Sequence, residues 1–505
     1  MGGAAMSDPR VRLLDPSGDP RPALAALDAV AVEIAVPQHL TQTTASAVAA
    51  LVAMTMRLFP NLTVIGDAAL GPNPWGAETV AGVLRASESV RPTSSRQPEK
   101  TLRVGIGSGN GAADLYLGGG AFTVRAGTSP QQLDHDEIAA HGHAIGVHAS
   151  ACLVAADLAK TALAPLGRPY VRLPEAFVCN LIDYRLTVAP AFAKRTSAPA
   201  NVLLAAAGSV GSSAAAILAT SPGVRGSAVI VDLDTLDPLR NPFRYPALTG
   251  METGPKSEWV SRFLREAGWK TTPYNGELGR WCAEQPSPGF DGILLSSVDT
   301  PQARFEVADV FARTTCSIGV AGLALHAQIE TLGDGRACPY CDFVTLEPAL
   351  SQADVIAAHL GLHGGVARVI ELQQPGAFLT AEDVGQVVAA GRVKESDSAS
   401  LIGRRLDDIV ARVYAESPVT ISDTGTTGSV AVAAPHVSWL AGVLGAAEVA
   451  KAAAGLPRLE RRVDIDLVGL PQGFTTISPQ DTSGRCACGS GHRKRWMDRL
   501  WRHAA

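Results

Sequence analysis

The chain has 505 residues, enough for two or three domains. Its net charge of −5 gives no electrostatic reason for it to bind nucleic acid or an anionic membrane. Hydrophobic residues make up 46% of the chain but aromatic residues only 5%, and such a composition favours closely packed layers of helix and β-sheet.

The N-terminus, the longest apolar stretch and the cysteines give no indication of a secreted, membrane-spanning or disulfide-rich protein. The N-terminus has neither the basic region nor the long apolar stretch of a signal peptide. The longest apolar stretch, 429–454, contains Pro435, Glu448 and Lys451, so it is not expected to cross a membrane. We therefore expect a cytoplasmic protein. Eight cysteines do not form a disulfide framework in a chain this long, and four of them are paired at metal-ligand spacing.

The first part of the chain has the pattern of an α/β domain. Residues 1–22 are polar and contain prolines, as in a flexible lead-in. Periodicity over 23–195 predicts a helix over 41–59, strands over 62–65 and 102–106, and a helix over 148–163. The glycine-rich stretch 105–111 is followed at once by strand-like residues, so no helix N-terminus is expected there to hold a phosphate.

A central unit begins near residue 196. An apolar run over 201–207 predicts a strand, the turn Gly208-Ser-Val-Gly211 leads into a small-residue helix, and a second strand over 227–231 ends in Asp232-Leu-Asp234. Glycines let a phosphate approach the backbone, and an acid about 20 residues later can bind a ribose hydroxyl. The first position of the GxGxxG fingerprint is Ala206, so a βαβ unit that binds no nucleotide is the alternative.

Further helices and strands follow in the same pattern. We expect a helix over 256–267, a strand over 292–297, a helix over 303–314, a strand over 323–331, two helices within an insertion over 342–427, an apolar helix over 437–453, a strand over 462–467 and a solvated basic tail over 491–505. No internal repeat is evident in the sequence, although the two successive α/β halves could be duplicated folds.

Taken in order, the polar residues of this region resemble those of the ThiF/MoeB and ubiquitin-activating-enzyme superfamily. The resemblance spans about 200–341 and 428–490 and rests on Gly208 to Gly211, Asp232 to Asp234, Asn241 to Arg244, Lys256, Asp299 with Arg304, and two cysteine pairs. It implies an α/β fold in which a Rossmann-like ThiF-type adenylation domain, over 196–341 plus 428–490, is preceded by a second, degenerate adenylation-like domain over 23–195.

The resemblance implies an enzyme that uses ATP to adenylate the C-terminal carboxylate of a ubiquitin-like or small protein, in a bacterial ubiquitin-like or sulfur-carrier pathway. Attack of a carboxylate on the α-phosphate joins two anions, so cations and Mg²⁺ must neutralise charge. The implied nucleotide-binding residues are Gly208, Gly211, Asp232, Asp234 and Asn241, and the implied catalytic residues are Arg244, Lys256 and Asp299. Alternatively, Arg244 and Lys256 are solvated surface charges and Asp299 caps a helix.

Four cysteines match the ligand number of a closed zinc site. Cys338, Cys341, Cys486 and Cys488 offer four thiolates, as a tetrahedral structural zinc site requires. The second pair is CxC, so His492 is an alternative to one of its thiolates. The remaining alternative is a set of reduced cysteines without metal.

The sequence also limits how far the reaction can proceed. No cysteine occurs between Cys341 and Cys486, although the resemblance leads one to expect a reactive cysteine there. Cys282 is the best candidate for an exposed thiol. We therefore expect the reaction to stop at the acyl adenylate or to pass it to a ubiquitin-conjugating-like partner. The family's arginine from a neighbouring subunit would imply a homodimer, and Arg185 is the only weak candidate for it.

Two other functions fit parts of the pattern. A glycine turn followed by an acid also suits an NAD-dependent oxidoreductase, although the charged stretch 241–256 and the cysteine pairs are not needed for hydride transfer. A non-catalytic docking protein would keep the fold and the zinc but not the turnover of ATP.

Overall fold

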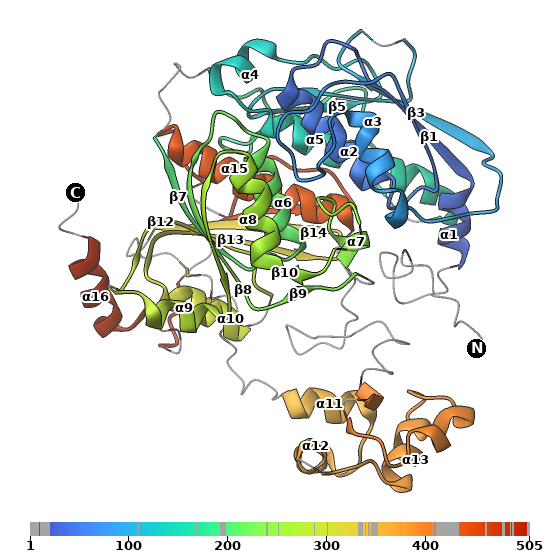
Figure 1. Ribbon diagram of the computed structural model, residues 1–505, viewed down its shortest axis with the longest axis vertical. Coiled ribbons are helices and arrows are strands. Elements are labelled where there is room, and N and C mark those ends of the chain that lie inside the picture. Colours follow the sequence, from blue (N-terminus) through green and yellow to red (C-terminus); the bar gives the residue numbers. More distant parts are fainter. Residues whose placement is uncertain are drawn as a thin grey trace. The chain divides into compact units, whose positions relative to one another are not determined.

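The computed structural model describes residues 10, 21–109, 111–167, 170–191, 198–238, 241–250, 252–286, 288–299, 301–331, 337–338, 340–341, 344, 352–374, 376–406, 408–410, 434–459, 462–476, 480–484, 486 and 489–501. The chain divides into two compact units (Figure 1). The first comprises Met1–Leu14, Asp19–Val344 and Val432–Ala505, and the second comprises Asp15–Gly18 and Thr345–Ala431.

The described part of the first unit contains two large sheets. The N-terminal sheet has the order β2-β1-β3-β4-β5-β6, with β1 (Val30–Ala35), β2 (Asn61–Ile65), β3 (Lys100–Ile106), β4 (Leu115–Gly119), β5 (Thr123–Gly127) and β6 (Phe177–Asn180). The C-terminal sheet has the order β11-β8-β7-β12-β13-β14-β15, with β7 (Ala200–Ala205), β8 (Gly226–Asp232), β11 (Lys270–Asn275), β12 (Phe290–Ser296), β13 (Ala312–Ala321), β14 (Ala324–Thr331) and β15 (Arg462–Asp466). A short antiparallel pair joins β9 (Thr235–Leu236) to β10 (Gly254–Pro255).

We call the described residues 21–191 the N-terminal half and those of 198–344 and 434–501 the C-terminal half. The helices of the N-terminal half are α1 (Arg21–Asp28), α2 (Gln42–Thr55), α3 (Val80–Ala86), α4 (His135–His141) and α5 (Ile145–Leu163). Those of the C-terminal half are α6 (Ser209–Ala219), α7 (Asn241–Arg244), α8 (Lys256–Glu266), α9 (Leu278–Glu284), α10 (Pro301–Asp309), α15 (Pro435–Ala453) and α16 (Gly491–Trp501).

The two sheets repeat one topology. Going outward from β2 and from β8, both sheets have three parallel pairings followed by two antiparallel ones. In both, one helix connects the first two strands of the half (α2 and α6), and one long helix precedes the last strand (α5 and α15). The chain therefore contains two copies of one α/β arrangement. No repeat of residues is evident in the sequence, but the resemblance implied a second domain of this kind, and the strand order shows the repeat.

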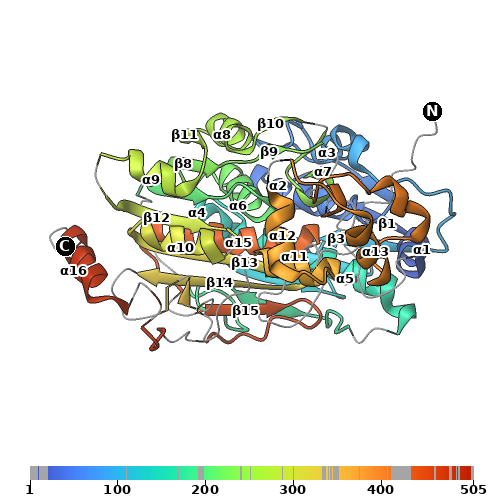
Figure 2. The same ribbon diagram turned by 90° about the horizontal axis from the view of Figure 1, so that it is seen from below.

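These four helices form the layer in which the halves meet. α15 packs against both α6 and α5, and α5 packs against α2 (Figures 1 and 2). α15 approaches α6 closely because Gly442 has no side chain: a Cβ there would lie 2.7 Å from the backbone nitrogen of Ala214. α5 belongs to a segment, Ile145–Leu166, that is long and apolar enough to cross a membrane, but 72% of its apolar window is buried by this packing.

The C-terminal sheet is covered on both faces, as expected for parallel strands. Successive residues of β7 point to opposite faces. Val202 and Leu204 join the core that contains α6, α8 and α15, whereas Leu203 and Ala205 join a separate core with α9 and α10. This arrangement confirms the α/β class with a Rossmann-like parallel sheet.

The second unit is a small helical bundle with its own core. Its described helices are α11 (Gln352–Leu360), α12 (Gly365–Gln373), α13 (Ala381–Ala389) and the 3₁₀ helix η5 (Glu395–Ser400). α13 begins with a capping box in which Thr380 and Asp383 exchange hydrogen bonds, and the guanidinium of Arg368 binds both oxygens of Asp383 at 2.9 and 2.8 Å. Leu360, Val369 and Val387 are among the buried residues of the bundle.

One expectation about local structure was wrong. The helix predicted over 303–314 ends at Asp309, since Phe311 has a φ of +53° and β13 begins at Ala312. The basic tail is helical over Gly491–Trp501. Within the expected lead-in, Arg10 is 1% exposed and its guanidinium pairs with Asp28 at 2.6 Å.

Candidate functional site

The candidate site lies where the chain reverses direction across the C-terminal sheet. From β7 the chain passes through α6 to β8 on one side, and it later returns to β12 on the other side of β7. In open α/β sheets such a switch point leaves a crevice at the carboxyl ends of the strands, where ligands bind. In this sheet the loops at the switch point are residues 206–208 after β7 and 297–299 after β12.

The turn after β7 has the backbone shape that a glycine fingerprint demands. Ala206, at the first fingerprint position, has a φ of +75°, a conformation that is rare for residues with a side chain. Gly208 is the N-cap of α6. At Gly211 a Cβ would lie 2.1 Å from the carbonyl oxygen of Ala206, so only glycine fits. The turn thus leads into the N-terminus of α6 as predicted.

Asp232 ties the end of β8 to this turn. One carboxylate oxygen accepts the N–H of Ala207 at 2.6 Å, and the other accepts the N–H of Asp234 at 2.8 Å. The side chain is 8% exposed, and burial raises its pKa although these two N–H groups and Lys256 oppose the shift. Each oxygen keeps a further lone pair for a hydroxyl ligand.

Lys256 and Asp234 form an ion pair beside Asp232. The Lys256 ammonium lies 2.7 Å from an oxygen of Asp234 and 6.0 Å from the centre of the Tyr245 ring. Burial lowers the pKa of Lys256, but Tyr245 and the two aspartates outweigh burial and raise it above its ordinary value. The lysine is thus held as a cation at the edge of the candidate site.

The segment 241–248 is joined to the first turn of α6. The Ser209 hydroxyl donates to the carbonyl of Arg244 at 2.5 Å, while the Arg244 side chain is exposed. The side-chain oxygen of Asn241 accepts the N–H of Asp237 at 2.7 Å and so shapes the start of α7. Tyr245, which sequence reasoning missed, is buried next to Gly208 and Lys256. Its position directly after Arg244 was the only sequence signal for it.

Asp299 lies exposed on the loop after β12. That loop is joined to the turn because the Ser297 hydroxyl donates to the carbonyl of Ala206 at 3.1 Å. Arg304, on α10, is 5% exposed and donates to the hydroxyl of Ser317 at 3.4 Å. The predicted nucleotide-binding and catalytic residues thus lie at the carboxyl ends of the parallel strands β7, β8 and β12 or in the segments that follow them. Arg185, in contrast, lies in the turn after β6, exposed and 3.5 Å from Asp183.

Three of the four predicted zinc ligands lie together. The sulfur atoms of Cys338, Cys341 and Cys486 are buried and 3.4, 3.6 and 3.7 Å apart, whereas Cys488 lies outside the described residues. A tetrahedral site with Zn–S bonds of about 2.3 Å separates its sulfurs by about 3.8 Å. The N–H of Asp481 points to the Cys341 sulfur at 3.5 Å, and its carboxylate accepts the N–H of Cys486 at 2.9 Å. The arrangement fits a zinc ion.

The other four cysteines lack the lowered pKa of a reactive thiolate, because burial raises the pKa of each of them. Cys152, Cys179 and Cys316 are buried, and burial raises the pKa of Cys179 to about 12. Burial likewise raises the pKa of half-buried Cys282 to about 11, so this side chain is protonated at neutral pH.

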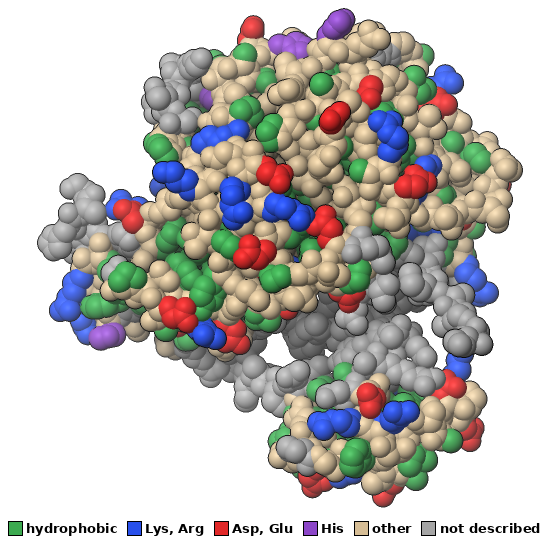
Figure 3. Space-filling model, viewed as in Figure 1, with side chains coloured by type: hydrophobic (Ala, Val, Ile, Leu, Met, Phe, Trp, Pro, Cys, Tyr) green, Lys and Arg blue, Asp and Glu red, His purple; other side chains and the backbone are tan. Residues whose placement is uncertain are grey.

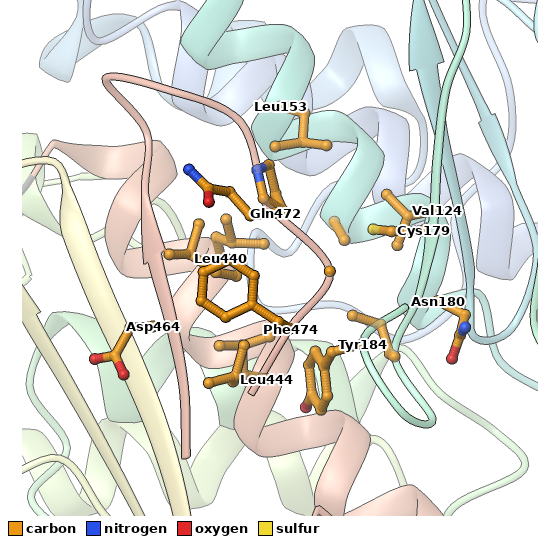
Figure 4. A pocket seen from close by; sticks show the side chains of 16 residues that line it. Val124, Leu153, Cys179, Asn180, Tyr184, Leu440, Leu444, Asp464, Gln472 and Phe474 are labelled. Atoms are coloured by element: carbon orange, nitrogen blue, oxygen red, sulfur yellow. The ribbon is translucent and has the colours of Figure 1, made fainter. Parts of the chain in front are cut away.

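A pocket elsewhere in the first unit is lined by both halves. Its side chains come from α5, β6, α15, β15 and the loop 471–474, and Figure 4 shows Phe474 beside Leu440, Leu444 and Tyr184. These residues are separate from the loops of the candidate site. On the face shown in Figure 3, basic and acidic side chains are interspersed, as the small net charge leads one to expect.

No family model matches the chain, and no curated protein matches it. Among solved structures, the chain is similar to E. coli MccB, with 16% identity and a TM-score of 0.33 over 58% of this chain and 65% of that chain. It is also similar to the microcin C7 biosynthetic enzyme MccB in complex with N-formylated MccA, with 17% identity and a TM-score of 0.33 over 57% and 67% of the two chains. The chain thus spans about 65% of the length of MccB. At this level of similarity, the function has to be argued from the chain's own residues.

Proposed function

We propose that this protein uses ATP to adenylate the C-terminal carboxylate of a small or ubiquitin-like protein. The observation that carries the proposal is the joining of the glycine turn to three charged segments: Asp232 binds the backbone of Ala207, Ser209 binds that of Arg244, and Ser297 binds that of Ala206. An anion-binding turn, a ribose-binding acid, two cations and an exposed carboxylate are the groups that this reaction requires.

In the proposed reaction, an oxygen of the substrate carboxylate attacks the α-phosphorus of ATP. The bond from that phosphorus to the bridging oxygen breaks, and pyrophosphate leaves with the electron pair. Arg244 and Lys256 neutralise the phosphates, and Asp232 binds the ribose. Asp299 would hold Mg²⁺, which neutralises the leaving pyrophosphate when bound. The product is an acyl adenylate, and the raised pKa of Cys282 supports the view that the chain forms no thioester of its own.

The proposed system also includes a structural zinc ion and a protein that accepts the adenylate. Zinc held by Cys338, Cys341, Cys486 and Cys488 would link the C-terminal segment to the segment that follows β14, since the three described sulfurs share one buried cluster. The acceptor of the adenylate would be a partner protein that carries its own thiol or amine.

Nucleotide titration by calorimetry tests the proposal. We expect Mg·ATP to bind the full chain, and Lys256→Met to weaken binding by about 10²-fold, while Lys270→Met, a change on exposed β11, leaves it unaltered. With a small protein substrate from the neighbouring genes, Asp299→Ala should abolish ATP–pyrophosphate exchange but retain ATP binding. Tight NAD binding without ATP binding would establish the oxidoreductase instead, and binding of neither nucleotide would favour a docking protein.

A further inference from the structure

One arginine of the N-terminal half is fully buried against the backbone of the C-terminal half. Arg57 follows α2, is 0% exposed and donates to the carbonyls of Pro242, Tyr245 and Leu248 at 2.7, 2.9 and 2.5 Å. A fourth bond, to Ala53 in its own helix, fixes the guanidinium at 2.5 Å. Arg57 therefore bridges the halves through main-chain atoms more than 180 residues away in the sequence.

Trp75 adds a second bond from the same half. Its indole N–H donates to the carbonyl of Pro246 at 2.9 Å, and its ring stacks on Trp439 of α15 at a centroid distance of 5.9 Å. Two side chains of the N-terminal half thus bind four carbonyls within the seven residues 242–248.

The same segment also carries candidate site residues. Asn241 and Arg244 lie in α7, and the Arg244 carbonyl accepts from Ser209 in the first turn of α6. The Tyr245 ring lies near the Lys256 ammonium. Since these carbonyls and the backbone of Arg244 and Tyr245 belong to one short segment, whatever holds the carbonyls also limits how far this backbone can move from the glycine turn.

Arg57 can exert this effect only indirectly. Its side chain has no exposed surface with which to touch a nucleotide or a protein substrate. Burial lowers its pKa to about 9, which still leaves it a cation at neutral pH. Carbonyl oxygens bind a buried cation most strongly when several converge on it, and they are left without partners when it is removed.

We propose that Arg57, assisted by Trp75, is a positioning residue through which the N-terminal half holds the segment 241–248 against the nucleotide-binding turn. The expected effect of Arg57 on ATP binding rests on the proposed function, whereas its expected effect on the backbone of 241–248 does not. The N-terminal half then has a role in the site although its own copy of the fold lacks the glycine turn.

Hydrogen exchange of the full chain tests the positioning directly. In Arg57→Met, we expect the amides of Tyr245 and Leu248 to exchange at least about tenfold faster, while those of α6 keep their protection. Arg57→Lys and Trp75→Phe should have intermediate effects, and they keep the test valid should Arg57→Met fail to fold. The matched control is Arg91→Met, because Arg91 binds the carbonyls of Pro60 and Leu62 within the N-terminal half.

ATP affinity and turnover supply the second readout. A misplaced segment should weaken Mg·ATP binding and reduce kcat in Arg57→Met by up to about 10²-fold, with partial recovery in Arg57→Lys. Unchanged protection of 241–250 in Arg57→Met would overturn the inference, as would full ATP affinity despite lost protection. If the wild-type chain binds no ATP, the proposed function fails while the exchange result still decides the role of Arg57.

Discussion

The hydroxyl of Ser297 donates a 3.1 Å hydrogen bond to the carbonyl of Ala206, and this bond joins the carboxyl ends of β12 and β7. Ala206 adopts a φ of +75° there, so the turn keeps a glycine-like backbone without a glycine. The left-handed region costs a residue with a side chain about 1–2 kcal/mol.

Ala206→Gly should therefore stabilise the protein. Relief of the left-handed strain exceeds the extra entropy of glycine in the unfolded chain, so we expect a gain of about 0.5–1 kcal/mol and a higher thermal unfolding midpoint. The neighbouring change Ala207→Gly, at a position without a positive φ, should lower the midpoint. If both variants lower the thermal unfolding midpoint equally, the turn is not strained at Ala206.

The buried ion pair between Glu448 and Lys451 should be costly to break. Both side chains are 0% exposed, the Lys451 ammonium also donates to the carbonyls of Leu181 and Ile182, and Glu448 accepts from Tyr184. Glu448→Gln leaves the lysine charge uncompensated and should destabilise the chain by about 3–5 kcal/mol in urea unfolding. Adding Lys451→Met should recover part of that loss. A double variant that is less stable than Glu448→Gln would contradict this account.

Three buried histidines predict a loss of stability in acid. Burial lowers the pKa of His143, His148 and His436 from 6.5 to about 3. Below 6.5 the unfolded chain binds protons that the folded chain does not, so each histidine lowers the free energy of unfolding by about 1.36 kcal/mol per pH unit as the pH falls toward 3.

This acid dependence can be measured from proton uptake on unfolding. At about pH 5, His148→Gln should reduce the uptake by about one proton, since the glutamine cannot titrate. An unchanged uptake in the His148 variant would show that this histidine is already protonated in the folded protein.

The cysteine cluster predicts one bound zinc ion per chain. Cys338→Ser should remove the metal and lower the thermal unfolding midpoint, because the site links Cys486 in the C-terminal segment to Cys338 and Cys341, which follow β14 in the chain. Cys282→Ser, which alters a half-buried thiol outside the cluster, should keep the metal. Elemental analysis of the purified protein measures the zinc content per chain, and metal-free wild-type protein would rule out the zinc site.

The elements of the central unit were predicted well because each of them corresponds to a short, recognisable sequence pattern. The apolar run before Gly208, the small residues after Gly211 and the acid Asp232 correspond to β7, α6 and the end of β8. The helix predicted over 303–314 was too long because Phe311, rather than a glycine, takes the positive φ that ends it.

What the sequence could not reveal depends on contacts between distant residues. The bonds from Arg57 to Pro242 and Leu248 span more than 180 residues, and an isolated arginine after an apolar helix carries no sign of them. The second copy of the fold was predicted from the family resemblance and not from a repeat in the residues, since strand order is fixed by pairing and packing rather than by residue identity.

The repeated topology has a consequence for binding stoichiometry. In a symmetric dimer of adenylation domains, each sheet would offer its own crevice. Here the loop after β1 has no glycine, so the N-terminal half lacks the turn that lets a phosphate approach the backbone in the C-terminal half. A titration should therefore saturate at one nucleotide per chain. The N-terminal half would then pack against the nucleotide-binding half without binding a nucleotide of its own.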